Sequence, residues 1–232
     1  MTLLSLQVHA DPCPAPRAFT VRRLICAGYS GRNEAAVRAH IEELAHEGVP
    51  PPEQIPLIMP VPARNLSTGT EIEVVSARTS GETEAVFFVA QKEIYVGVGS
   101  DHTDRGLERH DILQSKQVCP KIAGTNVWRL ADLRSHWDEL VLRSFVQEGD
   151  GPEELYQQGT LSLLRPPEDL LARAGATEGL VLFGGTVPVL NGSMRYAGRF
   201  RAELHDPATG RSLSCGYAVR VLAGAVAVAS ER

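Results

Sequence analysis

Long apolar runs are missing from this sequence of 232 residues. No segment approaches the ~20 consecutive apolar residues that a membrane-spanning helix needs, which argues against a helical membrane protein. Residues 1–8 form a short apolar run with no basic residues before it, unlike the pattern of a signal peptide. We therefore expect a cytoplasmic protein that has no membrane partner.

Paired cysteine motifs and basic stripes are also lacking. The four cysteines lie far apart and form no Cys-x-x-Cys pair, so in a cytosolic protein they are expected to be free thiols. The formal net charge is −5, and acidic and basic residues are interspersed. Because no basic stripe is present, nucleic-acid binding is not expected.

No repeat, low-complexity tract or long linker divides the chain, which predicts one domain over residues 1–232. A helix is expected over residues 32–47, since apolar residues recur there at helical spacing. Ser30 or Asn33 can cap its start, and Gly48 can end it. Pro50–Pro52 then forms a stiff connector. These features predict a helical N-terminal lobe in residues 1–65.

The remainder, residues 66–232, has the pattern of a β-rich core. Short runs rich in valine, isoleucine and phenylalanine, separated by glycine or polar turns, predict strands. A proline at the first turn and Gly175 past the end predict a short helix after Pro166. The expected strands are 72–77, 84–90, 93–99 and 140–147, with a helical turn over 130–137 and a C-terminal hairpin of 200–204 with 213–219. The predicted fold class is α+β and mostly β.

Acidic residues stand at the ends of two of these strands. Glu82 and Glu84 are two apart, so on an extended backbone they project to the same face. Asp101 ends the next run, and if it closes the neighbouring strand on that side, three carboxylates converge. Three hard oxygen donors with room for water and substrate suit Mg²⁺. Taken alone, however, such acids more often form the solvated face of a half-buried strand.

A resemblance across most of the chain favours the metal site. Residues 79–124 read TSGETEAVFFVAQKEIYVGVGSDHTDRGLERHDILQSKQVCPKIAG. They combine Glu-x-Glu, Asp101 followed by Thr103-Asp104-Arg105, and Lys116 ahead of Cys119-Pro120. Further on come the segments YQQGT at residues 156–160 and GGTVP at residues 184–188. In order and spacing, these blocks resemble the fumarylacetoacetate hydrolase (FAH) superfamily, and within it a compact branch, the DUF2848-like proteins.

The resemblance implies a rolled, mixed β-sheet, a homodimer, a small-molecule substrate and a Mg²⁺ (or Mn²⁺) ion held by Glu82, Glu84 and Asp101. Lys116 would supply a second positive charge to a developing oxyanion. The substrate would contact four residues. Arg105 is suited to gripping a carboxylate, Thr186 would donate its hydroxyl, and Glu108 and Tyr29 complete the set. Lys116 and Arg105 could instead only neutralise the acidic residues.

Water activation is where the sequence departs from the family. Hydrolases of the superfamily use a histidine and a glutamate near the N-terminus as a dyad, within an N-Y-x-x-H-x-x-E pattern. Here the segment from Gly28 to Glu34 has no histidine. The His-x-x-Glu spacing occurs slightly later, as His40 and Glu43, so one helix face can present both. The alternative is a solvent-facing polar pair.

These features predict a metal-dependent enzyme that acts on C–C bonds of a 2-oxo acid or an acylpyruvate-like 1,3-dicarbonyl compound through a metal-stabilised enolate. A hydrolase is the first interpretation. Decarboxylases and hydratases or other lyases on the same scaffold use the same chemistry. A non-catalytic small-molecule-binding protein that has lost the general base, or a plain structural β-domain, remains an alternative. The position of His40 relative to the metal site separates catalysis from binding alone.

Overall fold

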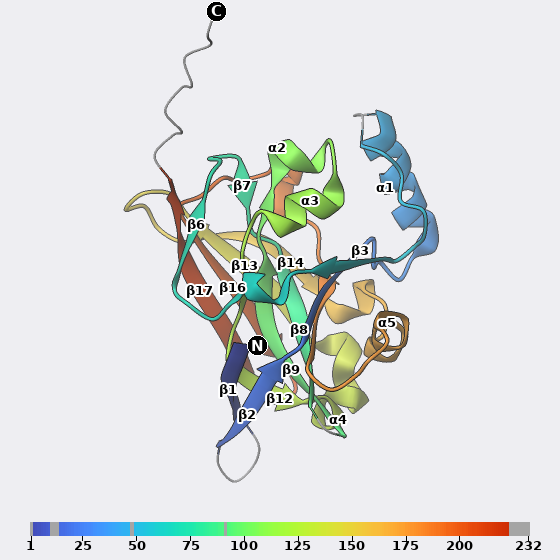
Figure 1. Ribbon diagram of the computed structural model, residues 1–232, viewed down its shortest axis with the longest axis vertical. Coiled ribbons are helices and arrows are strands. Elements are labelled where there is room, and N and C mark those ends of the chain that lie inside the picture. The colour runs from blue at the N-terminus through green and yellow to red at the C-terminus, as the bar shows by residue number, and fades with distance from the viewer. Residues whose placement is uncertain (1, 10–13, 47–48, 91, 223–232) are drawn as a thin grey trace, which may run out of the picture.

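The structure is a computed structural model that describes residues 2–9, 14–46, 49–90 and 92–222 (Figure 1). The strands are β1 (Thr2–Val8), β2 (Ala15–Val21), β3 (Arg23–Gly28), β4 (Leu57–Val61), β5 (Leu66–Ser67), β6 (Glu71–Val74), β7 (Thr79–Ser80), β8 (Thr83–Ala90), β9 (Glu93–Asp101), β10 (Thr103–Asp104), β11 (Lys121–Ala123), β12 (Asn126–Arg129), β13 (Val141–Gln147), β14 (Glu154–Thr160), β15 (Leu180–Thr186), β16 (Arg199–Asp206) and β17 (Arg211–Val221). The α-helices are α1 (Glu34–His46), α2 (Arg105–Glu108), α3 (Ile112–Gln117), α4 (Leu130–Leu133) and α5 (Pro167–Ala174), and the 3-10 helices are η1 (Ala63–Asn65), η2 (Arg134–Glu139), η3 (Leu161–Leu163) and η4 (Leu190–Gly192).

The largest element is a mixed ten-stranded sheet with the main order β2-β1-β12-β9-β8-β15-β3-β4. Its centre is β8, every residue of which is buried. Because neighbouring side chains of a strand point to opposite faces, Phe87 packs in one hydrophobic cluster and Phe88 in the other. Because β8 is covered on both faces, it needs apolar side chains on both, which explains its continuous apolar run.

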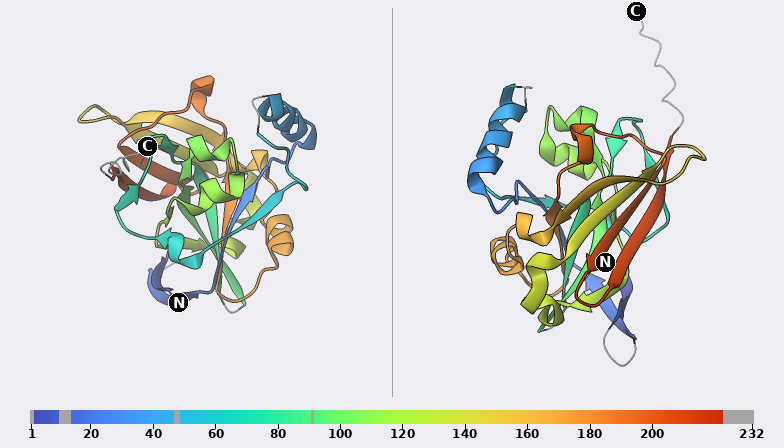
Figure 2. Two further views of the ribbon diagram at one scale, coloured as in Figure 1. Left: turned by 45° about the horizontal axis from the view of Figure 1, so that its top comes forward. Right: turned by 180° about the vertical axis from the view of Figure 1, so that it is seen from behind.

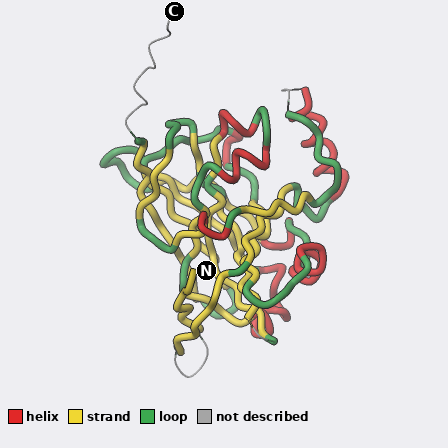
Figure 3. The backbone as a smooth tube through the Cα atoms, in the orientation of Figure 1, coloured by secondary structure: helices red, strands yellow, loops and turns green. Residues whose placement is uncertain are grey.

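A second, five-stranded sheet covers one face of the first, in the order β14-β13-β16-β17-β6. Its inward residues, such as Leu142 and Leu204, share a core with Phe87 and Val98 of the large sheet. Figure 2 shows this sheet from behind, and Figure 3 shows strands forming the body of the molecule with the helices around it. The large sheet curls, so the fold is a mostly-β half-barrel closed by a second sheet.

Several sequence-based predictions are confirmed. The first helix is α1, whose start is capped by Asn33, because its side-chain oxygen accepts a hydrogen bond from the Ala36 N–H at 3.1 Å. Gly175 ends α5 in the left-handed conformation, at φ +63°. The C-terminal hairpin pairs Phe200 with Tyr217 and continues to Asp206 opposite Arg211. The predicted helix end at Gly48 lies outside the described residues, as does Cys13.

The predicted helical N-terminal lobe is wrong. Strands β1, β3 and β4 of this region belong to the ten-stranded sheet, and β3 pairs in parallel with β15, more than a hundred residues further along. Its segment Leu24–Ala27 is buried there. Of the described helices in this region, α1 stands outside the sheet with Ile41 as its one buried residue (Figure 1), and η1 is a single 3-10 turn after β4. The N-terminal residues therefore complete the main sheet rather than form a separate unit.

Two further findings concern the described part of the chain. No helix in it is both long and apolar enough to cross a membrane. Cys26, Cys119 and Cys215 are free thiols, as the sequence predicts. Burial raises the pKa of the Cys119 thiol to about 11 and that of Cys215 to about 12. These thiols are protonated near neutral pH, which makes them weak nucleophiles.

Candidate metal centre

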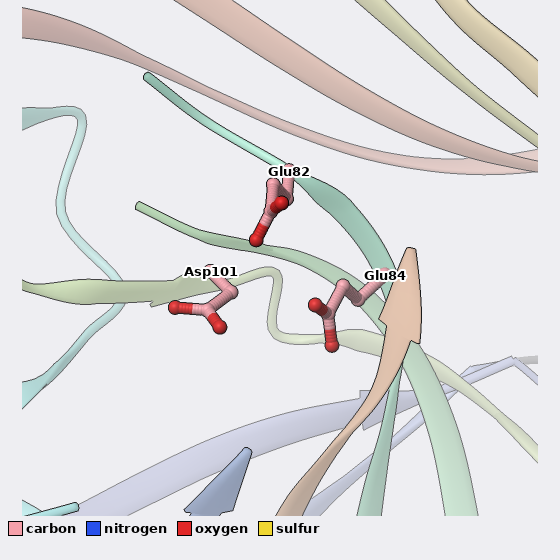
Figure 4. Close-up of side chains that lie close together, drawn as sticks. All are labelled: Glu82, Glu84 and Asp101. Carbon is pink, nitrogen blue, oxygen red and sulfur yellow. The ribbon is translucent and has the colours of Figure 1, made fainter. Parts of the chain in front are cut away.

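The three carboxylates predicted as metal ligands converge. One oxygen from each of Glu82, Glu84 and Asp101 can be chosen so that all three lie within 4.8 Å of one another. Glu84 and Asp101 are buried, whereas the side chain of Glu82 remains 17% exposed. Figure 4 shows the three side chains pointing into one shared space.

Pairing between β8 and β9 produces this convergence. The strands are antiparallel, with Thr83 opposite Ser100 and Glu84 opposite Gly99. One step beyond, the Asp101 N–H donates to the carbonyl oxygen of Glu82 at 3.0 Å. The register thus places Asp101 beside the two glutamates, as the sequence pattern predicts.

Lys116 lies among these carboxylates. Its helix, α3, begins at Asp111, whose side chain accepts a hydrogen bond from the Gln114 N–H at 2.9 Å. The Lys116 Nζ lies 2.8 Å from Glu82 Oε2 and 2.9 Å from Asp101 Oδ2. Burial would lower the pKa of Lys116, but the charges of Asp101 and Glu82 outweigh it and hold that pKa well above its ordinary value. Lys116 is therefore a fixed positive charge.

Lys121 is a second cation at the cluster, and sequence reasoning missed it. Its side chain is fully buried, and its Nζ lies 2.8 Å from Asp101 Oδ1 and also donates to the carbonyl oxygen of His102. Between them, the two ammonium groups occupy both oxygens of Asp101 and hold its pKa well below the ordinary value despite burial. The sequence contains only three lysines, and two of them lie here, a scarcity that could have signalled Lys121.

Glu84 differs from its two neighbours because no cation of the described residues lies within ion-pair distance of it. Burial, followed by the charges of Asp101 and Glu82, raises its pKa well above 4.5. Its Oε2 accepts one hydrogen bond, from the Gly185 N–H at 2.8 Å. A β-bulge between Phe183 and Thr186 turns this N–H toward the carboxylate.

Only glycine fits at position 185. Its φ is +96°, and a Cβ there would lie 1.7 Å from the Ser30 Oγ. Ser30 in turn donates to the carbonyl oxygen of Gly184 at 3.0 Å. The chain after β3 is thus packed tightly against the bulge that holds Glu84.

Arg105 borders the cluster on the side of α2. Its Nε donates to the Ser80 hydroxyl at 2.7 Å, and its Nη1 donates to Glu108 Oε2 at 2.8 Å. Its Nη2 lies 3.1 Å from Glu82 Oε1, yet it is buried without forming a hydrogen bond. Despite burial, Arg105 and Lys116 hold the pKa of Glu82 below its ordinary value. Arg105 therefore neutralises Glu82 and Glu108 and borders the cluster with a fixed positive charge.

The donor set fits a divalent cation. The three carboxylates supply hard oxygen atoms, which Mg²⁺ and Mn²⁺ prefer. Four carboxylates, those of the triad and Glu108, face three cations, namely Lys116, Lys121 and Arg105. When all are ionised, one negative charge is in excess, and Glu84 is the carboxylate without an ion-pair partner. A divalent cation would reverse this excess and leave the site attractive to an anionic substrate.

Thr186 and Gln157 connect the walls of the site. The Thr186 hydroxyl donates to the carbonyl oxygen of Thr83 at 2.8 Å and accepts from Gln157 Nε2 at 2.8 Å. Gln157 also accepts from the Thr83 N–H at 3.0 Å and donates to the carbonyl oxygen of Val187. The Thr186 hydroxyl thus already has protein atoms as hydrogen-bond partners, and its role in substrate binding stays a prediction.

The remaining predicted residues lie farther out. Tyr29, at φ +52°, is half-buried, and its pKa is raised by burial and by the charge of Glu108. His40 and Glu43 sit on α1 with side chains 61% and 76% exposed, and the His40 Nδ1 lies 3.6 Å from Glu43 Oε2. In the described part of the chain, neither forms an ion pair with the acidic cluster. The structure thus does not bring this pair to the carboxylates, and a general-base role for it stays a prediction.

Tyr217 braces the strand that carries Asp101, a role that the sequence did not indicate. Its hydroxyl lies 2.8 Å from the Ser100 Oγ and 2.9 Å from the His102 Nδ1, the residues on either side of Asp101. The Ser100 Oγ also accepts from the Glu82 N–H at 3.2 Å. Burial and neighbouring cations lower the pKa of His102 to about 3, so this imidazole is neutral. One hydroxyl from the second sheet therefore fixes the backbone of two predicted ligands.

Replacing Tyr217 with phenylalanine should weaken divalent-cation binding by about ten- to a hundredfold, the usual effect of losing a group that orients a ligand. The substitution leaves the Ser100 hydroxyl and the His102 imidazole buried without this hydrogen-bond partner, which should also lower the free energy of unfolding by about 1–3 kcal/mol. Titration calorimetry with Mn²⁺ measures the affinity. Tyr95→Phe, which removes a hydroxyl bonded to Glu93 at the other end of β9, is the matched control. Equal affinities in the two variants would contradict the bracing role.

Comparisons with known proteins agree with this fold. A crystal structure described as that of Cg1458 matches with a TM-score of 0.61 and 14% identity, covering 92% of this chain and 86% of that chain. The apo form of a 2-keto-3-deoxy-D-arabinonate dehydratase matches with a TM-score of 0.59 and 14% identity, covering 93% and 79%. No curated protein sequence matches the chain. These structural matches support the FAH-like fold inferred from the sequence.

The family comparison covers most of the chain. The family described as protein of unknown function, DUF2848, matches residues 27–217. This range runs from the end of β3 to Tyr217 and contains the acidic triad, both buried lysines and Arg105. The chain therefore belongs to the DUF2848 family and has the fold of the FAH superfamily.

Proposed function

We propose that this protein is a divalent-metal-dependent enzyme that acts on a 2-oxo acid or an acylpyruvate-like 1,3-dicarbonyl compound. The observation that carries the proposal is the triad of Glu82 with the buried Glu84 and Asp101, which has Lys116 among its oxygens. A purely structural ion-pair cluster would match each acid with a cation, whereas here Glu84 has none within ion-pair distance.

The chemistry follows from the charges. A bound divalent ion supplies a Lewis acid that stabilises negative charge on the substrate oxygens as a carbanion or enolate develops. Lys116 places a permanent positive charge beside the same oxygens. The guanidinium of Arg105, which borders the cluster, is suited to the substrate carboxylate. Together these groups select a small anion that can delocalise charge next to a carbonyl.

The reaction that follows enolate formation distinguishes the candidates. Hydrolysis of a C–C bond needs a base that activates water, and His40 with Glu43 lies exposed on α1. Hydrolysis by this pair therefore requires α1 to approach the carboxylates. Decarboxylation or dehydration needs no such water, and one structural match is named a dehydratase. A lyase is accordingly the second candidate, and a binding protein without turnover is the third.

The first test is a thermal-shift measurement with oxalate, a mimic of an enolate. Oxalate should raise the unfolding temperature only when Mg²⁺ or Mn²⁺ is present. Glu82→Ala should lose this response, because it removes one of three ligands. Glu139→Ala, a change at an exposed acid, is the control and should respond like the wild type. Equal stabilisation of Glu82→Ala, or stabilisation without metal, contradicts the proposed site.

Isotope labelling separates the reaction types once a substrate is accepted. Hydrolysis in H₂¹⁸O puts ¹⁸O into the carboxylate of the released acid. Decarboxylation releases CO₂, and dehydration releases water from the substrate. His40→Gln should abolish hydrolysis by the dyad and leave a lyase reaction unchanged, so this variant also tests the role of α1.

A further inference from the structure

A cavity of about 360 Å³ is lined by none of the residues of the acidic cluster and is not explained by it. It is formed by the chain that follows α1, by β4 and by the start of α3. Its walls are largely apolar, including Pro51, Leu57, Met59, Ile112 and Leu113. Its volume falls in the usual range of small-molecule sites.

The helix α3 connects the cavity to the acidic cluster. Leu113 lines the cavity, and Lys116 follows three residues later on the same helix. Residues three apart on a helix are neighbours on its surface. The wall of the cavity and the lysine that contacts Glu82 and Asp101 are thus carried by the same short helix, one turn apart.

Tyr29 provides a second, independent connection. It lines the cavity, and its pKa responds to the charges of Glu108 and Lys116. It adopts φ +52°, a backbone conformation that residues other than glycine rarely adopt and that is frequent at functional sites. The next residue, Ser30, contacts the Gly184–Gly185 bulge that holds Glu84. Tyr29 thus lines the cavity and directly precedes the residue that contacts the bulge beside Glu84.

The polar groups of the cavity do not suit a charged ligand. Its titratable residues besides Tyr29 are Glu53, His110 and Asp111. Asp111 is engaged in capping α3, because it accepts hydrogen bonds from the Gln114 backbone and side chain. Among the described residues, no lysine or arginine lines the cavity, so a carboxylate or phosphate would find no permanent positive charge there, only the imidazole of His110 beside two acids.

We infer that this cavity is the subsite for a neutral, apolar substituent of the substrate, of the size of a phenyl ring or a short alkyl chain. The inference rests on the proposed function, since the 2-oxo acid head binds at the metal centre. The enzyme then selects 2-oxo acids or acylpyruvates with a hydrophobic tail over those that end in a second carboxylate. Leu113 and Leu57 set this preference.

Titration calorimetry with Mg²⁺ and three 2-oxo acids tests the subsite. Pyruvate supplies the head alone, phenylpyruvate adds an apolar ring, and 2-oxoglutarate adds a charged tail. Burying the ring should make phenylpyruvate bind about ten- to a hundredfold tighter than pyruvate. In contrast, 2-oxoglutarate should bind no tighter than pyruvate.

Leu113→Gln should reduce the preference for phenylpyruvate to about threefold or less while leaving pyruvate binding unchanged, because it places a polar group in the apolar wall. Pyruvate binding to this variant also verifies that it is folded. Leu57→Ala is a second variant, at the β4 residue that lines the cavity, and Leu155→Gln, at an exposed leucine of β14, is the matched control.

The outcomes separate the two proposals. If pyruvate binds in the presence of metal but phenylpyruvate binds no tighter than pyruvate, or if 2-oxoglutarate binds tightest, the subsite is refuted and the proposed metal centre is not. A preference for phenylpyruvate that survives both Leu113→Gln and Leu57→Ala also refutes it. If no 2-oxo acid binds in the presence of Mg²⁺, the proposed function fails and the subsite fails with it.

Discussion

Replacing Lys116 with methionine should slow turnover about 100- to 1,000-fold and at the same time tighten divalent-cation binding. The loss of turnover follows from removing a positive charge beside the developing oxyanion. The gain in affinity follows because the Lys116 Nζ contacts Glu82 at 2.8 Å and Asp101 at 2.9 Å, where it competes with a cation for the same oxygens. A residue that only supported the fold would not change these two quantities in opposite directions.

Metal affinity is measured by calorimetry with Mn²⁺, and turnover with whichever 2-oxo acid the wild type accepts. The metal-free variant should also lose stability, because the buried Asp101 and the partly exposed Glu82 both lose a partner; breaking a fully buried pair costs about 3–5 kcal/mol, and Lys121 remains on Asp101. Lys92→Met is the matched control, since Lys92 is exposed on the turn between β8 and β9. Weaker or unchanged metal binding in Lys116→Met would show that the lysine does not compete with the ion.

Lys121 gives an internal comparison with Lys116. It contacts the other oxygen of Asp101, but its side chain is fully buried and also binds the carbonyl oxygen of His102. Lys116 also has Glu82 and the Thr103 hydroxyl as partners, so it contacts two of the three carboxylates. We therefore assign Lys121 to holding Asp101 in place and Lys116 to the substrate side.

The sequence was sufficient to predict the centre of the site because the relevant interactions are local. Glu82 and Glu84 are two residues apart, and β9 follows β8 after a short turn, so alternation and register bring Asp101 to them. The same locality explains why α1, α5 and the final hairpin were predicted correctly. Their capping residues, turns and apolar periodicities lie within the elements themselves.

Residues contributed by distant segments could not be predicted in this way. Tyr217 is more than a hundred residues from Ser100, and Gln157 is 74 residues from Thr83. The parallel pairing of β3 with β15 is also non-local, and without it the N-terminal strands resemble a separate lobe. Alternation identifies which side chains share a face, but it does not identify which strands are neighbours.

Glu84→Gln should abolish the response to divalent cations and raise the stability of the metal-free protein above about pH 5. The wild-type carboxyl is buried without a cation, so its pKa in the folded state lies well above the ordinary 4.5. Below that ordinary value both states hold the proton, and Glu84 causes no loss of stability. As pH rises toward the folded-state pKa, the unfolded chain releases the proton first, so the folded state is progressively destabilised.

Glutamine keeps the acceptor for the Gly185 N–H and carries no charge. The variant therefore does not lose stability as pH rises in the way that the wild type does. In thermal unfolding in EDTA from pH 4 to pH 9, the unfolding temperature of the wild type should fall relative to that of the variant as pH rises. For a chain of this size, each kcal/mol of lost stability lowers it by about 2–4 °C. Glu139→Gln, at an exposed acid, should follow the wild type.

The same proton links pH to metal binding. A cation that coordinates Glu84 must displace its proton, so the affinity of the wild type for Mg²⁺ or Mn²⁺ should increase with pH until Glu84 is ionised in the free protein. Calorimetry in buffers of different ionisation enthalpy measures the released proton directly. Affinity that is independent of pH, together with a Glu84→Gln variant that binds metal as the wild type does, would remove Glu84 from the ligand set. The cluster would then be a two-carboxylate site balanced by Lys116, and the charge argument for an anionic substrate would lose its basis.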